Sequence, residues 1–383
     1  MKVKFLLAVF AVCAMLASVS CGKSKGDELV IGVQGPETGS IAIYGLSDLS
    51  GAQLAVDEIN DKGGINGKKL KLVHYDSRGD KTEAVNVTQR LINNDKVCAI
   101  LGEVTSGAMF AIGKIANDSG TVVLSAGATA EGVTDNMPFV FRDTLLDSDG
   151  APQTIKFLTA NKNWKNFAII TSVNNDYSVG LSKIFKESIL SNGGSVVAEQ
   201  SISDGDTNIS AQITALKNKT FDAVVFSGYY QEAALILLEL RKQGIKVPLV
   251  GGDGLQSAEV FNVAKTASFG SVFFAGFAPN ADVPVIKEFI SKMNKQKKTA
   301  DMFSAQGYDG IYLFAEAMKK SGMNDCTSKE QRDKMRAELA STKDFQGVSG
   351  KMSFDEQGNA RKVPFVQEFV DDGKGGYSWK LIN

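Results

Sequence analysis

Histidine is nearly absent from this sequence: His74 is the only one among 383 residues. Histidine is the side chain that most often transfers protons in enzymes, and it is a common metal ligand. His74 lies in the run 70–75, so we expect it to be an ordinary strand residue. The polar stretch 76–80 offers carboxylates to a metal, but a loop after a strand is the better interpretation.

Other catalytic motifs are missing as well. The sequence has no Gly-x-Ser-x-Gly elbow with a plausible histidine partner and no Gly-x-x-x-x-Gly-Lys-Ser/Thr phosphate loop. We therefore expect no enzyme, no bound cofactor and no metal. Basic charge is not in excess either, because 42 Lys and Arg residues face 43 Asp and Glu residues. Without a basic cluster or zinc-finger spacing, we expect no nucleic-acid partner.

The N-terminus carries an apolar run, residues 5–16, which follows Lys2 and Lys4. The run is shorter than the roughly 20 apolar residues that a membrane-spanning helix needs. Small residues at 17–20 and then Cys21 follow it. This order of charges, apolar residues and small residues predicts a secretory signal peptide at 1–21, so we expect the protein to be exported.

The cysteine that ends this leader is similar to the processing site of bacterial lipoproteins, in which the cysteine receives a diacylglycerol and becomes the N-terminus. Those proteins usually have leucine three positions before the cysteine, where this chain has Ser18. The polar segment 22–28 favours the lipoprotein, because it has the composition of a flexible tether. We expect a protein of the cell envelope, anchored through Cys21. A secreted protein in which Cys21 has no special role is the alternative.

Two cysteines remain once Cys13 leaves with the signal peptide and Cys21 carries the lipid. Cys98 lies in the apolar run 97–101, and Cys326 lies in a polar loop. The two could pair in an oxidising compartment, but we expect a buried, unpaired Cys98 that packs as a small apolar residue.

About 360 residues follow the leader, which favours two domains. Short β-branched runs alternate with helical patterns along them. Strands are predicted at 29–33, 70–75, 99–102, 121–125, 167–171, 195–199, 223–227, 247–251 and 271–275. Helices are predicted at 51–62, 82–93, 108–116, 179–192, 209–217, 231–243 and 284–296. This alternation indicates α/β lobes, in which helices cover both faces of a parallel sheet.

The alternation occurs twice, with polar breaks at 142–150 and 276–280. We therefore predict two doubly wound lobes joined by several crossings. Lobe 1 comprises residues 29–147 plus 277–363, and lobe 2 comprises residues 148–276 plus 364–383. The ligand of such a clamp lies in the cleft at the carboxyl ends of both sheets, and hinge closure is its natural motion.

At the level of residues, segments 39–45, 51–55 and 59–70 resemble the branched-chain (leucine/isoleucine/valine) amino-acid-binding proteins of bacterial ABC importers. The resemblance continues in order through 75–77, 102–106, 128–130, 141–144, 228–229 and 354–358. It implies the type I periplasmic-binding fold, a monomer, an amino-acid ligand and an ABC permease as membrane partner.

A closed amino-acid site needs donors for the carboxylate and acceptors for the ammonium, because unpaired buried charge is costly. Ser106 precedes the predicted helix 108–116, so its hydroxyl and N–H can meet a carboxylate at a helix N-terminus. Gly127 and Thr129 follow the next strand, and the resemblance assigns ligand contacts to all three residues. The family commonly has alanine at the position of Gly127, but a backbone carbonyl survives that change.

The resemblance also indicates Asp253 as the counter-charge of the ammonium, where the related protein has glutamate. It assigns six further residues to the pocket wall: Tyr44, Phe303, Val104, Thr105, Tyr177 and Tyr229. The related protein has a half-cystine at the position of Thr105, so that disulfide is absent here. Each residue has a plainer alternative role: Ser106 as a helix cap, Asp253 as a turn former and Tyr229 as core.

Two function classes stay open beside amino-acid transport. A sensory or chemoreceptor-associated binding protein shares this fold, as does a binder of another small polar ligand such as an amide or urea. Asp253 favours a ligand that carries an amine. The sequence does not rank leucine, isoleucine, valine, alanine and phenylalanine, because one methylene changes affinity by only about 1–3 kcal/mol.

Overall fold

The computed structural model describes residues 28–382. The predicted signal peptide and Cys21 lie outside these residues. Glu28 was expected to end the tether, but it is the first residue of strand β1. No helix in the described part of the chain is long and apolar enough to cross a membrane.

One lobe is built on a five-stranded parallel sheet in the order β2-β1-β3-β4-β5. Its strands are β1 (Glu28–Gly35), β2 (Lys69–Asp76), β3 (Ala99–Leu101), β4 (Val122–Ser125) and β5 (Val140–Arg142). The helices of this lobe are α2 (Ala42–Asp61), α3 (Lys81–Arg90), α4 (Ser106–Ser119), α10 (Pro284–Lys295), α11 (Met302–Lys320) and α12 (Lys329–Ala340). A small antiparallel sheet of β11 (Phe345–Gly347), β12 (Gly350–Phe354) and β13 (Ala360–Arg361) completes it.

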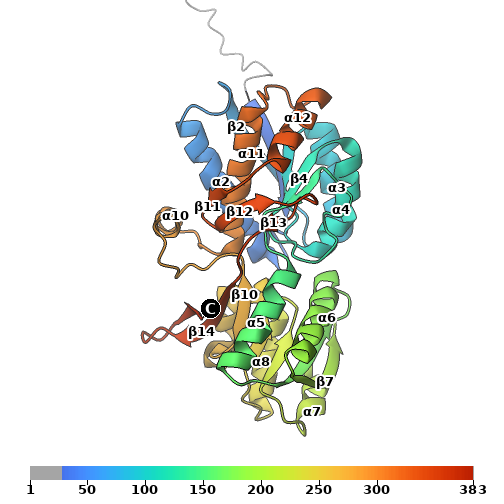
Figure 1. The fold of residues 1–383 in the computed structure, drawn as a ribbon, viewed down its shortest axis with the longest axis vertical. Coiled ribbons are helices and arrows are strands. Elements are labelled where there is room, and N and C mark those ends of the chain that lie inside the picture. The colour runs from blue at the N-terminus through green and yellow to red at the C-terminus, as the bar shows by residue number, and fades with distance from the viewer. Residues whose placement is uncertain (1–27, 383) are drawn as a thin grey trace, which may run out of the picture.

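The second lobe is built on a seven-stranded sheet in the order β15-β14-β10-β9-β8-β6-β7. Five strands are parallel: β6 (Asn166–Ser172), β7 (Ser195–Ile202), β8 (Ala223–Phe226), β9 (Leu249–Gly251) and β10 (Val272–Ala275). The strands β14 (Phe365–Asp371) and β15 (Tyr377–Leu381) are antiparallel to their neighbours. The helices are α5 (Asp147–Asn161), α6 (Asp176–Ser191), α7 (Ser210–Leu216), α8 (Tyr230–Lys242) and α9 (Ala258–Ala264). The predicted architecture of two α/β lobes is confirmed (Figure 1).

The chain passes between the lobes at residues 143–146, 276–283 and 362–364. The predicted crossing 142–150 is therefore too long, because Asp147 already begins α5. Gly150 and Pro152 look like helix breakers in the sequence. In the fold, Gly150 lets α5 pack tightly on the sheet, since a Cβ at this position would lie 2.2 Å from the ring of Phe274.

Helices α2 and α11 of lobe 1 pack closely together beside the sheet. A Cβ on Gly51 would lie 1.9 Å from the carbonyl oxygen of Ser304, and one on Gly307 would lie 2.4 Å from that of Asp48. Only glycine permits this approach of two backbones. The close contact brings the first turns of both helices, with Tyr44 and Phe303, to the edge of the lobe that faces lobe 2.

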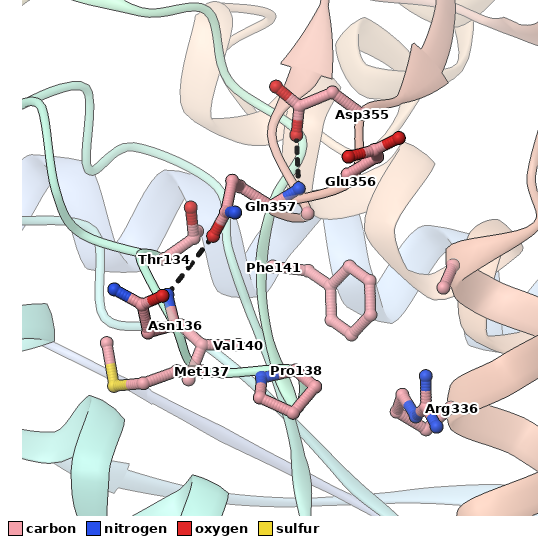
Figure 2. Close-up of a pocket in the computed structure, with 12 residues that line it drawn as sticks. Thr134, Asn136, Met137, Pro138, Val140, Phe141, Arg336, Asp355, Glu356 and Gln357 are labelled. Atoms are coloured by element: carbon pink, nitrogen blue, oxygen red, sulfur yellow. Dashed lines mark hydrogen bonds between the residues drawn. The ribbon is translucent and has the colours of Figure 1, made fainter.

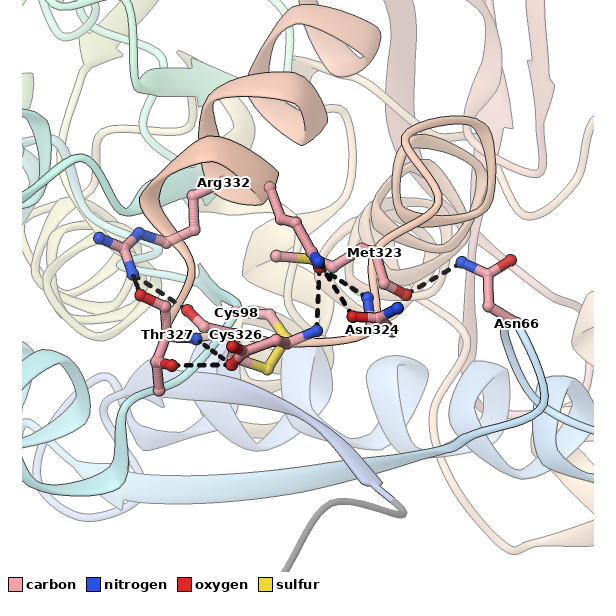
Figure 3. The surroundings of a disulfide bond; sticks show 9 residues. Asn66, Cys98, Met323, Asn324, Cys326, Thr327 and Arg332 are labelled. Carbon is pink, nitrogen blue, oxygen red and sulfur yellow. Dashed lines mark hydrogen bonds between the residues drawn. A yellow bond between two sulfur atoms is a disulfide. The ribbon is translucent and has the colours of Figure 1, made fainter.

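Cys98 and Cys326 form a disulfide, so the expectation of an unpaired Cys98 is wrong (Figure 3). Cys98 directly precedes β3 at the N-terminal edge of the sheet, and Cys326 lies in the loop between α11 and α12. Arg332 holds that loop, because its Nη1 donates to the carbonyl oxygens of Cys326 and Thr327. Nothing in the sequence indicates that this loop lies over the start of β3.

Candidate ligand-binding site

Nine of the ten predicted site residues line one cavity between the lobes, together with Gly254. Lobe 1 contributes Tyr44, Val104, Thr105, Ser106, Gly127 and Phe303, and lobe 2 contributes Tyr177, Tyr229 and Asp253. The tenth, Thr129, is fully buried behind this wall. The free space inside this cavity is about 10 Å³, which is room for about one water molecule. The lobes are therefore closed, and a ligand must part them to enter.

The N-terminus of α4 forms one wall of the cavity. Thr105 is the N-cap residue, and no side chain caps the helix. The Oγ of Ser106 accepts a hydrogen bond from the backbone N–H of Ala130 at 3.2 Å. An uncapped helix N-terminus presents free N–H groups and a partial positive charge, which together suit a carboxylate.

The loop after β4, residues 126–130, lies beside this helix end. The Oγ of Ser125 accepts from the N–H groups of Gly127 at 3.3 Å and Ala128 at 2.9 Å. The hydroxyl of Thr129 is buried and has no hydrogen-bond partner. At Gly127 a Cβ would lie 2.4 Å from the carbonyl oxygen of Val104 and 2.8 Å from the ring of Phe303, so an alanine there would require these neighbours to shift.

Asp253 faces this wall from lobe 2. It follows β9 and Gly252, at the start of a single 3₁₀ turn, and its side chain is buried. The hydroxyl of Tyr177 donates to its Oδ1 at 2.9 Å. Burial raises the pKa of Asp253 to about 7, although this hydrogen bond partly offsets the shift. A carboxyl group in this position gains from a cation that enters the cleft.

Asp147 is a second buried acid near Asp253, although it does not line the cavity, and sequence analysis missed it. It is fully buried, and its carboxylate oxygens make no hydrogen bond of good geometry, although the hydroxyl of Thr129 lies near them. Its pKa lies well above the usual range, first because of burial and then because of the negative charge of Asp253, while Thr129 and the positive charge of Arg142 partly offset the shift. Its N–H donates to the carbonyl oxygen of Thr129 at 3.1 Å. Arg142 is therefore a cation for Asp147, whereas no cation contributes to the pKa of Asp253.

Aromatic rings form the apolar part of the cavity. Tyr44 stacks on Phe303 with ring centroids 4.3 Å apart, and its edge meets Tyr229 at 5.7 Å. Tyr177 and Tyr229 stack in parallel at 5.7 Å. The hydroxyl of Tyr44 donates to the carbonyl oxygen of Gly254 at 2.7 Å, which joins the lobes across the cleft. These rings offer an apolar surface to an aliphatic side chain.

An ion pair between Lys81 of α3 and Asp176 of α6 spans the mouth of the cleft, with Nζ and Oδ2 2.6 Å apart. Both side chains are about half exposed. The pair lies over Gly107, the second residue of α4, where a Cβ would come within 3.0 Å of both. It therefore bridges the lobes directly above the helix N-terminus that lines the site.

A wider groove of about 660 Å³ lies on lobe 1 alone, between α12, the β12–β13 turn and residues 134–141 (Figure 2). Arg336 reaches into it from α12, and Gln357 accepts from the N–H of Asn136 at 3.1 Å. None of the predicted site residues lines this groove. Since only one lobe builds it, lobe closure does not shape it, and the interlobe cavity is the candidate site. Within residues 28–382, no cluster of three or more His, Cys, Asp or Glu side chains could hold a metal.

The chain belongs to the periplasmic binding protein family, whose model matches residues 28–374. This is a family of solute-binding proteins, and it implies an extracytoplasmic location. The predicted resemblance to branched-chain amino-acid-binding proteins is confirmed by individual relatives.

A leucine-binding protein, LivK from Thermotoga maritima, is 32% identical with a TM-score of 0.84, over 92% of this chain and 97% of its own. The isoleucine complex of LivJ from Streptococcus pneumoniae is 34% identical with a TM-score of 0.84, over 93% and 99%. A leucine-, isoleucine-, valine-, threonine- and alanine-binding protein from Pseudomonas aeruginosa is 28% identical over 363 residues, 94% of each chain.

Proposed function

We propose that this protein is a lipid-anchored solute-binding protein that captures an L-amino acid with an aliphatic, branched side chain and delivers it to an ABC importer. One observation carries the proposal. The cleft pairs an uncapped helix N-terminus on one wall with the buried carboxyl of Asp253 on the other, and no cation of the protein neutralises that carboxyl. Such a site matches the two charges of a zwitterion.

The ligand carboxylate binds at the N-terminus of α4, where it accepts hydrogen bonds from backbone N–H groups and from the hydroxyl of Ser106. The buried hydroxyl of Thr129 lies behind these donors. The ammonium group pairs with Asp253, which ionises as it enters, and Asp147 adds negative charge behind it. The side chain packs against the rings of Tyr44, Phe303, Tyr177 and Tyr229, which form most of the apolar wall.

Closure of the lobes then traps the ligand in the cleft. The closed cavity leaves room for about one water molecule, so binding and release both require the lobes to separate. The membrane permease receives the ligand when the lobes part. The names of the relatives support an aliphatic ligand, and the aromatic wall suits one.

A binder of neutral ligands, such as an amide or urea, is the second candidate, whether in transport or in sensing. The buried carboxyl of Asp253 argues against it. A neutral ligand leaves Asp253 buried without a cation, so it gains none of the charge pairing that the site can provide.

A thermal-shift screen of the twenty amino acids, with urea and acetamide alongside, tests the proposal on protein that lacks residues 1–21. A ligand at one hundred times its Kd stabilises the folded state by about 2.7 kcal/mol, which raises the melting temperature. We expect leucine, isoleucine or valine to give the largest rise. No rise with any L-amino acid at millimolar concentration refutes the amino-acid function, and a rise with urea or acetamide alone supports the second candidate.

A further inference from the structure

Arg142 is one of the largest fully buried side chains in the described chain, and the ligand contacts proposed above do not use it. It ends β5, directly before the first crossing between the lobes. Its backbone N–H donates to the carbonyl oxygen of Gly358 at 3.0 Å. A buried guanidinium requires several partners, so its contacts show what it holds in place.

The guanidinium binds the backbone of the loop after β4. Its Nη1 donates to the carbonyl oxygens of Ala128 at 2.9 Å and Ala130 at 2.7 Å. These two carbonyls flank Thr129, whose hydroxyl is left free, and the N–H of Ala130 donates to Ser106. The same nitrogen therefore fixes the backbone on both sides of a proposed ligand donor.

The other side of the guanidinium holds a hinge segment. Its Nε donates to the Oδ1 of Asn359 at 2.7 Å. Asn359 lies three residues before the third crossing, and the hydroxyl of Thr134 donates to the same Oδ1 at 2.8 Å. One side chain therefore connects the loop at 127–130 with the segments that lead into two of the three crossings.

We infer that Arg142 is a positioning residue: it holds the 127–130 loop in the geometry that binds ligand and ties this loop to the hinge. The expected effect of Arg142 on affinity rests on the proposed function, but its hydrogen bonds to the loop and to Asn359 are present without ligand. Arginine suits the role because its rigid, planar group directs several donors at fixed angles, which the single ammonium of lysine does not do.

Arg241 provides a matched control. Its guanidinium also binds backbone carbonyls, three of them: those of Ile245 and Val247 through Nη1 and that of Ala267 through Nη2, at 2.9–3.0 Å. These carbonyls lie around the start of β9, whereas the cleft lies beyond its end. Arg241→Lys therefore disturbs the same kind of contact without touching the candidate site.

The experiment compares Arg142→Lys and Arg241→Lys by calorimetric titration with the best amino acid from the screen and by hydrogen exchange without ligand. Loss of even one charged hydrogen bond, about 1.5 kcal/mol, predicts roughly tenfold weaker binding for Arg142→Lys. We also expect faster exchange of the Ala128 and Ala130 amides in the ligand-free variant. Arg241→Lys lowers the melting temperature but leaves Kd within about twofold and these amides unchanged.

Normal affinity in Arg142→Lys, or an equal loss in Arg241→Lys, overturns the inference. If the wild type binds no amino acid, the proposed function fails, while hydrogen exchange still decides whether Arg142 holds the loop. If Arg142→Lys does not fold, Asn359→Ala tests the hinge side alone. We expect it to weaken binding while the Ala128 and Ala130 amides stay protected, and unchanged binding refutes the link to the hinge.

Discussion

Replacing Asp253 by asparagine removes the counter-charge from the cleft and keeps its shape. Removing one partner of a buried ion pair typically costs about 2–5 kcal/mol, which is roughly 30- to several-thousand-fold in Kd. Asp147 still adds negative charge close to the position of Asp253 in this variant, so we expect a loss near the lower bound. Asp147→Asn should also lower the affinity, and the double variant should lower it further.

The same pair predicts how affinity depends on pH. In the closed form without ligand, burial holds the pKa of Asp253 at about 7, so the group is mostly protonated below that pH. The ammonium binds the ionised form, and binding therefore releases a proton. Affinity is full above about pH 7 and falls by up to tenfold for each pH unit below it, since one pKa unit is worth about 1.4 kcal/mol. Asp253→Asn removes this part of the pH dependence.

Calorimetric titration with the best ligand of the screen, at about pH 6, 7 and 8, measures both effects. Asp309→Asn is the control, because Asp309 is also a buried aspartate but is held by backbone N–H groups of Val348 and Ser349 away from the cleft. A solvated turn aspartate at position 253 would change affinity by less than about a factor of three. An unchanged Kd in Asp253→Asn, together with a flat pH profile in the wild type, refutes the assignment of Asp253.

Three further outcomes follow from other contacts. Lys81→Met removes the ion pair at the mouth of the cleft. Because exposed ion pairs contribute up to about 1 kcal/mol, ligand release measured by stopped flow should accelerate by no more than about fivefold. High salt should accelerate ligand release from the wild type similarly. Substitution of both Cys98 and Cys326 by serine should lower the free energy of unfolding by about 2–5 kcal/mol in denaturant titrations. The Kd should stay unchanged, because the disulfide lies at the edge of the sheet opposite the cleft, and an altered Kd contradicts this. Cys21→Ser should move the protein from the membrane fraction to the soluble fraction on immunoblots, and retention would show another anchor.

Sequence patterns predicted much of the fold for physical reasons that hold within short segments. The runs at 29–33, 70–75 and 223–227 are rich enough in apolar and β-branched residues to form strands, and they lie at β1, β2 and β8. Residues predicted after strands came together because the carboxyl ends of parallel strands share one edge of a sheet. This explains why Ser106, Gly127 and Asp253 line one cavity.

What the sequence did not predict depends on contacts between distant segments. The pairing of Cys98 with Cys326 needs a loop 228 residues away to lie over β3. The start of α5 was interpreted as a polar crossing, because Gly150 is recognisable as a packing residue only when Phe274 lies against it. With that helix missed, Asp147 had no predicted position, and nothing distinguished it from a solvated loop acid.

Arg142 and Asp147 stand at the two ends of the first crossing, which makes this segment part of both the hinge and the site. Asp147 begins a helix of lobe 2, yet its N–H bonds Thr129 of lobe 1, whose flanking carbonyls Arg142 holds. Parting the lobes gives water access to Asp147 and Asp253, and closing them buries both acids. Closure around a ligand without an amine must keep these acids protonated, whereas an ammonium lets them ionise and stabilises the closed form. On the proposed function, recognition of the amine is therefore coupled to closure: a ligand without an amine can meet the donors of lobe 1, but it gains no charge pairing when the lobes close.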